Sequence, residues 1–259
     1  MFFTKEKPSP LDSTQGKESL DQFKQRKQNE DVAYYLNTED DWNKEYQEEY
    51  FPKTPVIQGP QEQKKETQTN ISTGYQKERK EWENFYQTHF KEKVDLSKVK
   101  IPKKPTTGSW RLIFIKQGLT IEEAFQKCKE LFDAIKYTQE PLDEVVTENT
   151  RKPTQQHYAI WVKDTLEPDP EYLGKSTQQV DPDMKIGITL LERLILELKY
   201  YSETKKHLDI KGATFCTSSR DAFGGVPGVN WGGGGSGLVV GWCFLGSSGP
   251  GCGLRVAVS

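Results

Sequence analysis

The chain has 259 residues, a formal net charge of -2 and 34% hydrophobic residues, so no overall positive charge would draw it to nucleic acid or to an anionic membrane. No stretch approaches the roughly 18 apolar residues of a membrane span, and the first residues lack the apolar core of a signal peptide. The four cysteines contain no C-x-x-C pair, which argues against a structural zinc site or a redox motif. We expect no metal and no cofactor.

Residues 1–105 are dominated by Lys, Glu, Gln, Asn and Thr, and most of this region has no sustained apolar period. Such a composition cannot offset the entropy of ordering, so we predict that the region is mostly disordered. The exception is 78–94, where Trp82, Phe85, Tyr86, Phe90 and Val94 recur at helical spacing. Two roles are open for this amphipathic helix: it packs on its own domain, or it binds a protein partner.

A Pro- and Lys-rich joint at 101–108 marks the expected boundary of a folded domain, 106–259. Its first element is predicted to be a strand at 110–115, followed by a helix that Thr120 and Glu123 cap and whose apolar face runs to Ile135. A second strand is expected at 158–162, and a second helix starts after Thr189, ending near His207. Short strands are expected at 213–216, 226–231, 238–244 and 254–258, which together predict an α+β domain.

The C-terminal end is rich in glycine and almost without charge. Thirteen of the 21 glycines lie between Gly224 and Gly253, and Arg255 is the only charged residue after Asp221. A flexible linker is one interpretation, although Trp231 and Trp242 indicate packing. A phosphate-binding loop is a second interpretation, but the Lys and the helix that such a loop needs do not follow these glycines. A cysteine-dependent oxidase or hydrolase would use Cys216, Cys243 or Cys252, although this segment contains no histidine.

A fourth interpretation starts from missing residue types. Residues 222–259 contain no Lys, Glu, Gln or Met, all of which have codons ending in a purine. Apart from Trp231 and Trp242, the residues present can all be written with a codon ending in a pyrimidine. That pattern is expected where Asn codons, AAC or AAT, have had their two adenines replaced at random. The alternative is an ordinary glycine-rich strand region that lacks these residues by chance.

Several stretches, in order, carry a family resemblance: 110–120 (WRLIFIKQGLT), 158–163 (YAIWVK), 187–194 (GITLLERL) and 206–209 (KHLD), followed by Ser219, Arg220, Val226, Pro227, Trp231, Leu238, Trp242, Leu254, Arg255 and Ser259. The chain resembles the variable proteins of diversity-generating retroelements that have a C-type-lectin fold of the formylglycine-generating-enzyme type, like those of archaeal viruses and small-genome prokaryotes. In that family a reverse transcriptase miscopies the adenines of a template repeat, and the product replaces the 3′ end of the gene.

The resemblance implies a non-enzymatic ligand- or receptor-binding protein with a variable region at about 216–259. Since the sequence shows neither a signal peptide nor a membrane span, we expect the protein to be cytoplasmic or virion-associated. It implies scaffold roles for Arg220, Val226, Pro227, Trp231, Leu238, Trp242, Leu254 and Arg255. It implies variable, ligand-facing positions at Asp221, Gly225, Gly228, Asn230, Gly233, Val239, Gly241, Cys243, Phe244, Gly246, Ser247, Ser248, Pro250, Gly251 and Cys252. Phe244 is the main aromatic anchor expected, with Phe223 and Leu245 as further contributors. The alternatives are a cysteine-dependent oxidase on the same fold and a scaffold protein that acts through residues 1–105.

Overall fold

The computed structural model describes residues 74–232 and 237–259. Within them the chain forms a mixed α+β unit with few helices and mainly antiparallel strands. The disorder predicted for residues 1–73 and the variable position Gly233 lie outside the described residues. No helix of the described part is long and apolar enough to cross a membrane.

The helical elements are α3 (Gln76–His89), α4 (Ile121–Leu131), α5 (Leu142–Val145), the 3-10 turn η2 (Pro170–Tyr172), α6 (Thr177–Val180) and α7 (Leu190–Thr204). The strands are β1 (Trp110–Ile115), β2 (Ala134–Lys136), β3 (Val146–Asn149), β4 (Tyr158–Lys163), β5 (Ala213–Phe215), β6 (Ser219–Asp221), β7 (Val226–Trp231), β8 (Leu238–Cys243), β9 (Cys252–Leu254) and β10 (Ala257–Val258).

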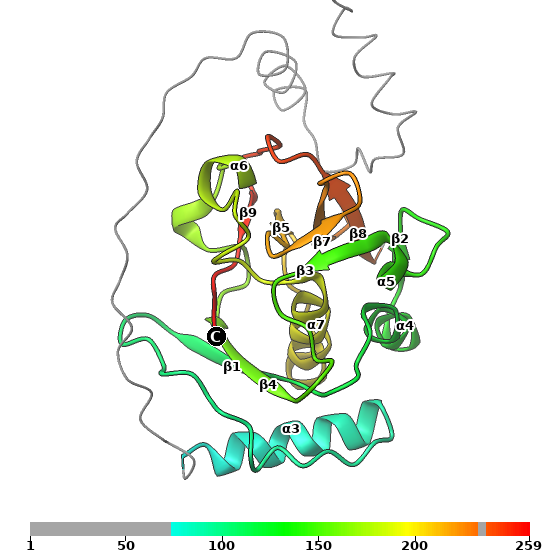
Figure 1. Cartoon of the computed structure of the whole chain (residues 1–259), viewed down its shortest axis with the longest axis vertical. Helices are drawn as coiled ribbons and strands as arrows, with labels where there is room; N and C mark the ends of the chain where they lie inside the picture. The colour runs from blue at the N-terminus through cyan, green and yellow to red at the C-terminus, as the bar shows by residue number, and fades with distance from the viewer. Residues whose placement is uncertain (1–73, 233–236) are drawn as a thin grey trace, which may run out of the picture.

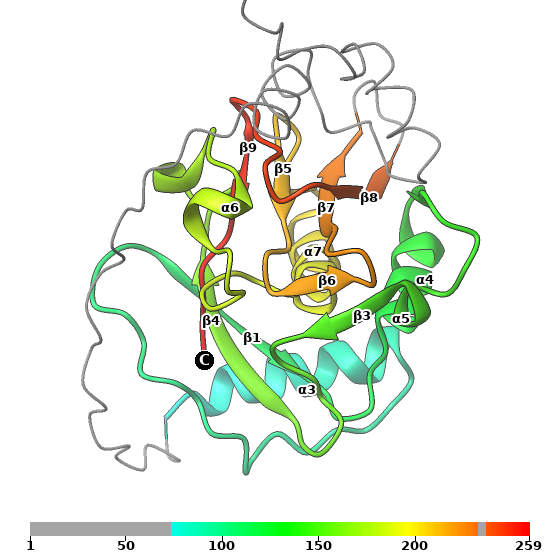
Figure 2. The ribbon, with the colours of Figure 1, turned by 45° about the horizontal axis from the view of Figure 1, so that its top comes forward.

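These strands form three sheets, arranged around α7 in Figures 1 and 2. The largest has the order β2-β8-β7-β5-β9, and the two others are β1-β4-β10 and β3-β6. Most pairs are antiparallel, but β2 runs parallel to β8 and β9 runs parallel to β5. Both parallel strands lie at the edges of the large sheet, so the antiparallel hairpin β7–β8 occupies its middle region.

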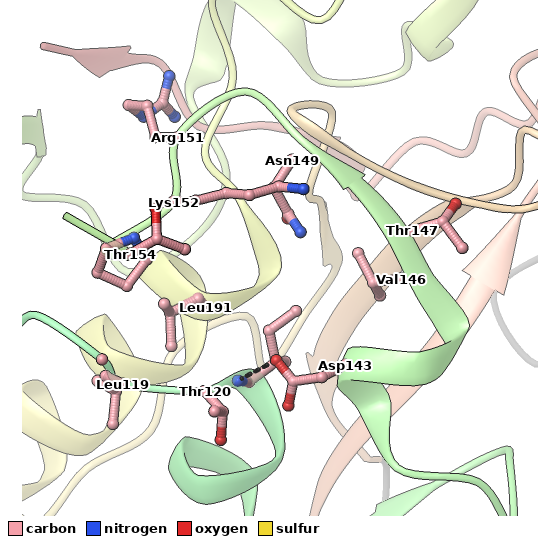
Figure 3. A pocket seen from close by; sticks show the side chains of 13 residues that line it. Leu119, Thr120, Asp143, Val146, Thr147, Asn149, Arg151, Lys152, Thr154 and Leu191 are labelled. Atoms are coloured by element: carbon pink, nitrogen blue, oxygen red, sulfur yellow. Dashed lines mark hydrogen bonds between the residues drawn. The ribbon is translucent and has the colours of Figure 1, made fainter.

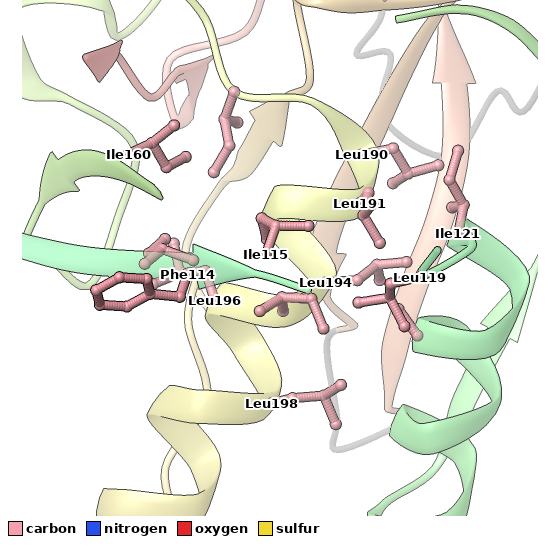
Figure 4. Close-up of a cluster of buried hydrophobic side chains, with 14 of the residues drawn as sticks. Phe114, Ile115, Leu119, Ile121, Ile160, Leu190, Leu191, Leu194, Leu196 and Leu198 are labelled. Carbon is pink, nitrogen blue, oxygen red and sulfur yellow. The ribbon is translucent and has the colours of Figure 1, made fainter. Parts of the chain in front are cut away.

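Helix α7 forms the centre of the core. Its start is the predicted one: the Thr189 side chain accepts a hydrogen bond from the Glu192 backbone, and the Glu192 carboxylate accepts one from the Thr189 backbone. Leu191, Leu194 and Leu198 are buried on the side of the helix that faces Leu119 and Ile121, as Figure 4 shows. Full burial of one such side chain stabilises the fold by about 1.5–3 kcal/mol.

Two features of the expected helix at 121–135 need correction. Phe132 is fully extended at φ -159°, so α4 ends at Leu131. Ile135, which the periodicity assigned to the apolar helix face, instead lies in β2 and is 43% exposed. A short apolar run can follow either period, and here pairing with β8 decides the conformation.

Helix α3 packs on the domain that follows it. Trp82, Phe85, Tyr86 and Phe90 belong to the same buried cluster as the strands β1 and β4. Of the two alternatives for this amphipathic helix, intramolecular packing is the one that the structure shows. The packed unit thus includes α3, which precedes the boundary expected near residue 105.

The same helix covers an open strand edge. β1 lies at the end of its sheet, with β4 on one side only. The Trp82 indole donates a hydrogen bond of 3.1 Å to the Leu112 carbonyl, and the Tyr86 hydroxyl donates one of 2.7 Å to the Phe114 carbonyl. The Tyr86 oxygen also accepts the Lys116 backbone N–H at 3.1 Å. These contacts satisfy backbone groups that would otherwise offer a template for another strand.

Candidate ligand-binding surface

The hairpin β7–β8 carries the centre of the glycine-rich segment. It is antiparallel over its whole length, from Val226 opposite Cys243 to Trp231 opposite Leu238. Because successive side chains of a strand point to opposite faces, and directly paired residues share a face, this register divides the hairpin into two sets. We call the positions 227, 229, 231, 238, 240 and 242 the core face, and 226, 228, 230, 239, 241 and 243 the outer face.

The core face is directed at the main hydrophobic cluster. Val229, Leu238, Val240 and Trp242 are buried in it, and Trp231 packs against it while half-buried. The expected scaffold residues Pro227, Trp231, Leu238 and Trp242 all belong to this face. Their side chains therefore share the core with α7 or border it, where substitution costs packing.

The outer face gathers five of the expected variable positions. Gly228 pairs with Gly241, Asn230 pairs with Val239, and Cys243 pairs with Val226. Val226, a scaffold position, is the exception, because it packs with Cys243 and Phe215 in a second, smaller cluster. Towards the other end, Ile135 of β2 is paired with Val239 and so extends this face by an exposed apolar side chain that the sequence pattern had placed in a helix.

A tight turn joins β6 to β7 and displays an aromatic ring. The Asp221 carboxylate accepts hydrogen bonds from the backbone of Phe223 at 2.8 Å and of Gly225 at 2.7 Å. Gly224 has φ +84°, a conformation that side-chain-bearing residues rarely adopt. Phe223 at the tip of this turn is 96% exposed. Asp221 and Gly225, both expected to vary, therefore build the turn, and Phe223 is its most accessible side chain.

The segment 244–251 links β8 to β9 and closes over one end of the outer face. Leu245 packs on the second cluster, and its carbonyl accepts the Gln178 backbone N–H of α6 at 2.8 Å. The Ser247 side chain accepts the Phe244 backbone N–H at 3.1 Å. Of the expected variable positions here, Gly246, Ser247 and Ser248 are buried, Phe244 and Gly251 are half-buried and Pro250 is exposed.

Cys243 and Cys252 lie beneath this segment, where they are 1% and 9% exposed. Gly251 approaches Gly212 so closely that a Cβ at Gly212 would lie 1.7 Å from the Gly251 carbonyl oxygen. Sequence composition gave no indication of this close approach. In the conformation described, Cys243, Cys252, Ser247 and Ser248 contribute mainly to the packing of the loop rather than to an accessible surface.

Arg255, an expected scaffold residue, is fully buried and saturated with hydrogen bonds. Its guanidinium donates to the carbonyls of Thr165 and Leu166 at 3.0 and 3.1 Å, and to the Asp209 carboxylate at 2.6 Å. Asp209 also faces Arg193, whose Nε donates to it at 2.9 Å. Burial alone would raise the pKa of Asp209, but the two guanidinium groups outweigh it and hold this pKa below its ordinary value.

The network continues to a histidine that the sequence placed only at a helix end. Glu197 accepts a hydrogen bond from Arg193 at 2.9 Å and lies 2.9 Å from His207 Nδ1. The His207 ring is stacked between Tyr201 and Trp231. The stretch 206–209 thus connects α7 to the end of β7. The i, i+4 spacing of Arg193 and Glu197 is the sequence signal that indicates this network.

Arg220 and Leu254 complete the scaffold set. The Arg220 guanidinium donates to the carbonyls of Thr217 at 2.6 Å and of Ser219 at 2.8 Å, and Leu254 is 1% exposed in β9. Nearby, Asp181 accepts backbone N–H groups of Lys185 at 2.6 Å and Gly187 at 3.0 Å. Arg220 therefore holds the backbone that leads into the Asp221 turn.

The cysteine chemistry considered from sequence has little support in this environment. All four cysteines are buried. Burial is the largest cause that raises the pKa of the Cys216 thiol and of the Cys128 thiol above their ordinary values, which disfavours the reactive thiolate. Among the residues that the structure describes, no group of three His, Cys, Asp or Glu side chains is placed to hold a metal ion.

Comparison of the chain with known protein families, curated proteins and solved structures gave no match.

Proposed function

We propose that this chain is a ligand- or receptor-binding protein with a C-type-lectin fold, and that adenine-directed retroelement mutagenesis diversifies its C-terminal surface. The observation that carries the proposal is the division of the β7–β8 hairpin. With the exception of Val226, the hairpin positions expected to vary lie on the outer face and those expected to stay constant lie on the core face. Substitution on the outer face would leave the side chains of the core face in place. Of the five outer-face positions expected to vary, Asn230 is half-buried and Gly228, Val239, Gly241 and Cys243 are buried.

The accessible part of the surface is apolar and carries little charge. Phe223 stands at the tip of its turn, Ile135 borders Val239, and Phe244 is half-buried at the end of β8. Aromatic anchors on a fixed backbone lose little entropy on binding and often dominate interface energies. The ligand surface that fits this one is itself apolar, with hydrogen-bonding groups for the exposed backbone of the turns.

Asn230 is the polar member of the outer face. Its side-chain oxygen is buried and has no hydrogen-bond partner in the described part of the chain. A buried acceptor without a partner costs about 1–3 kcal/mol. A residue that stabilises the strand so little is what a surface selected for binding, rather than for folding, would contain.

Two libraries of the full chain test the proposal. One randomises 228, 230, 239, 241 and 244, and the matched control randomises the core-face positions 229, 240 and 242. We expect most members of the first library to fold cooperatively and some to acquire new ligands, and most members of the second to unfold. Equal loss of folded protein in both libraries would refute the proposal.

The neighbouring DNA gives an independent test. We expect a near-identical template repeat with adenines at the variable codons, beside a reverse transcriptase gene. A genome that encodes the chain without such a repeat would count against diversification while leaving ligand binding testable by the libraries.

A further inference from the structure

A pocket separate from the variable surface lies between the start of α4, the start of α7 and β3 with the loop that follows it. Its volume is about 270 Å³, and its apolar wall includes Leu119, Val146 and Leu191. This volume lies just below the range of about 300–1,000 Å³ that is typical of small-molecule sites. The pocket therefore suits a small metabolite rather than a nucleotide or a folded partner.

One side of the pocket is negatively charged and held in place. The Asp143 carboxylate accepts the backbone N–H groups of Ile121 at 2.9 Å and Glu122 at 2.8 Å, at the first turn of α4. Each carboxylate oxygen has a second acceptor site. Asp143 is exposed, so these sites remain accessible to a cationic group in the pocket.

The other side presents hydrogen-bond donors. Asn149 accepts the Ser219 hydroxyl at 2.6 Å through its side-chain oxygen, which directs the amide nitrogen away from Ser219. Lys152 belongs to the same lining, and its exposed side chain is labelled in Figure 3. Two donors, one of them charged, thus line the same pocket as the Asp143 carboxylate.

The loop that carries Lys152 is fixed by its neighbour. The Arg151 guanidinium donates two hydrogen bonds to the buried Glu192 carboxylate, at 2.7 and 2.8 Å, and one to the Gly187 carbonyl at 2.7 Å. Arg151 is therefore neutralised by α7 and leaves Lys152 as the cation that serves the pocket. A fixed loop reduces the entropy lost when a ligand binds.

We propose that this pocket binds a small zwitterion of the amino-acid class with an aliphatic side chain. The ligand carboxylate meets Lys152 and the Asn149 amide, its ammonium group meets Asp143, and its side chain lies against Leu119, Val146 and Leu191. All of these residues precede the variable region, so the inference does not depend on the proposed diversification.

Isothermal titration calorimetry of the full chain with L-leucine, which has nine non-hydrogen atoms, tests the pocket. The matched ligands are 4-methylpentanoate, which lacks the amine, and 3-methylbutylamine, which lacks the carboxylate. We expect L-leucine to bind, and each analogue to bind at least about tenfold more weakly because one charged contact is lost. Equal affinity for all three compounds, or no binding of L-leucine at millimolar concentration, would overturn the proposal.

Variants locate the binding. Lys152→Met removes the cation. Lys129→Met is the control, because Lys129 is an exposed lysine on α4. It lies eight residues after Ile121, and thus about 12 Å from that residue along the helix. We expect at least about a tenfold loss with Lys152→Met and no change with Lys129→Met. Thr154→Trp, at an exposed lining position, should block binding while the circular-dichroism melting curve stays that of the wild type. Unchanged affinity in both Lys152→Met and Thr154→Trp would show that the compound binds elsewhere and would refute the assignment.

Discussion

Trp242→Ala tests whether Trp242 stabilises the fold, in contrast to the nearby Phe244, which is expected to contact the ligand. Trp242 is 4% exposed on the core face of β8, inside the main hydrophobic cluster. Truncation of such a residue to alanine costs about 3–5 kcal/mol, through lost transfer energy and the cavity left behind. A domain of this size loses roughly 2–4 °C in Tm for each kcal/mol, so we expect a fall of about 6–20 °C.

Phe244→Ala is the matched comparison, two residues further along the chain. Phe244 is half-buried, so its truncation should cost about 1 kcal/mol and lower Tm by only a few degrees. Differential scanning calorimetry of both variants provides the measurement. The reasoning fails if Trp242→Ala melts within about 2 °C of the wild type, or if Phe244→Ala is destabilised as strongly.

The indole N–H of Trp242 sharpens this test. It is buried and has no hydrogen-bond partner within the described residues, so the side chain acts by packing alone. Trp242→Phe removes an unsatisfied donor along with some volume, and the two effects oppose each other. We therefore expect Trp242→Phe to lie much closer to the wild type than Trp242→Ala.

Three further predictions concern the edge helix, the buried charges and the binding surface. Tyr86→Phe leaves the Phe114 carbonyl and the Lys116 N–H without the tyrosine hydroxyl, so calorimetry should show a loss of about 1–3 kcal/mol; an unchanged Tm would contradict the role of α3. Because the pKa of Asp209 is below its ordinary value in the folded chain, its stabilisation is present above about pH 4 and is lost as the pH falls further. Urea unfolding between about pH 2 and 7 should show that loss in the wild type but not in Asp209→Asn. At neutral pH the variant should be less stable by about 3–5 kcal/mol. Identical pH profiles of the two proteins would refute this role of Asp209. Ligand affinity at the variable surface should change little with salt, since Arg255 is buried and Asp221 is the only other charge from 221 onward; a steep loss in a salt titration would count against this surface.

The sequence predicted the elements that have a strong local signal. The capping residues Thr120 and Thr189 placed the starts of α4 and α7 correctly, since a side chain that accepts a backbone N–H defines a helix start locally. The β-branched runs of β1, β4 and β7 were also placed within a residue of their ends. These features depend on neighbours in sequence, so one chain is enough to find them.

Elements that depend on distant partners were missed. β3 and β6 are short and polar, and they exist as strands because Val146 pairs with Asp221 and Asn149 with Ser219. The expected strand at 254–258 is divided into β9 and β10, which belong to different sheets on either side of Arg255. No local sequence pattern predicts that the Arg255 guanidinium is buried and donates hydrogen bonds to the carbonyls of Thr165 and Leu166.

The candidate surface shows the same limit. Alternation along β7 and β8 could be anticipated from the strand pattern, and the register confirms that both are strands of one hairpin. The strand pattern does not predict which of these side chains are accessible. That depends on the segment 244–251, which covers Cys243, and on the Asp221 turn, which exposes Phe223. Coverage by a loop depends on how the loop folds back, which single-residue composition does not encode.

The hydrogen bonds from Trp82 and Tyr86 to β1 have a consequence for the gene as well as for the protein. The device that prevents strand-to-strand association is encoded more than a hundred codons upstream of the glycine-rich end. Under the proposed function, each rewriting of the 3′ end would leave this protection untouched. New surfaces could then be sampled without each variant having to solve the aggregation problem again.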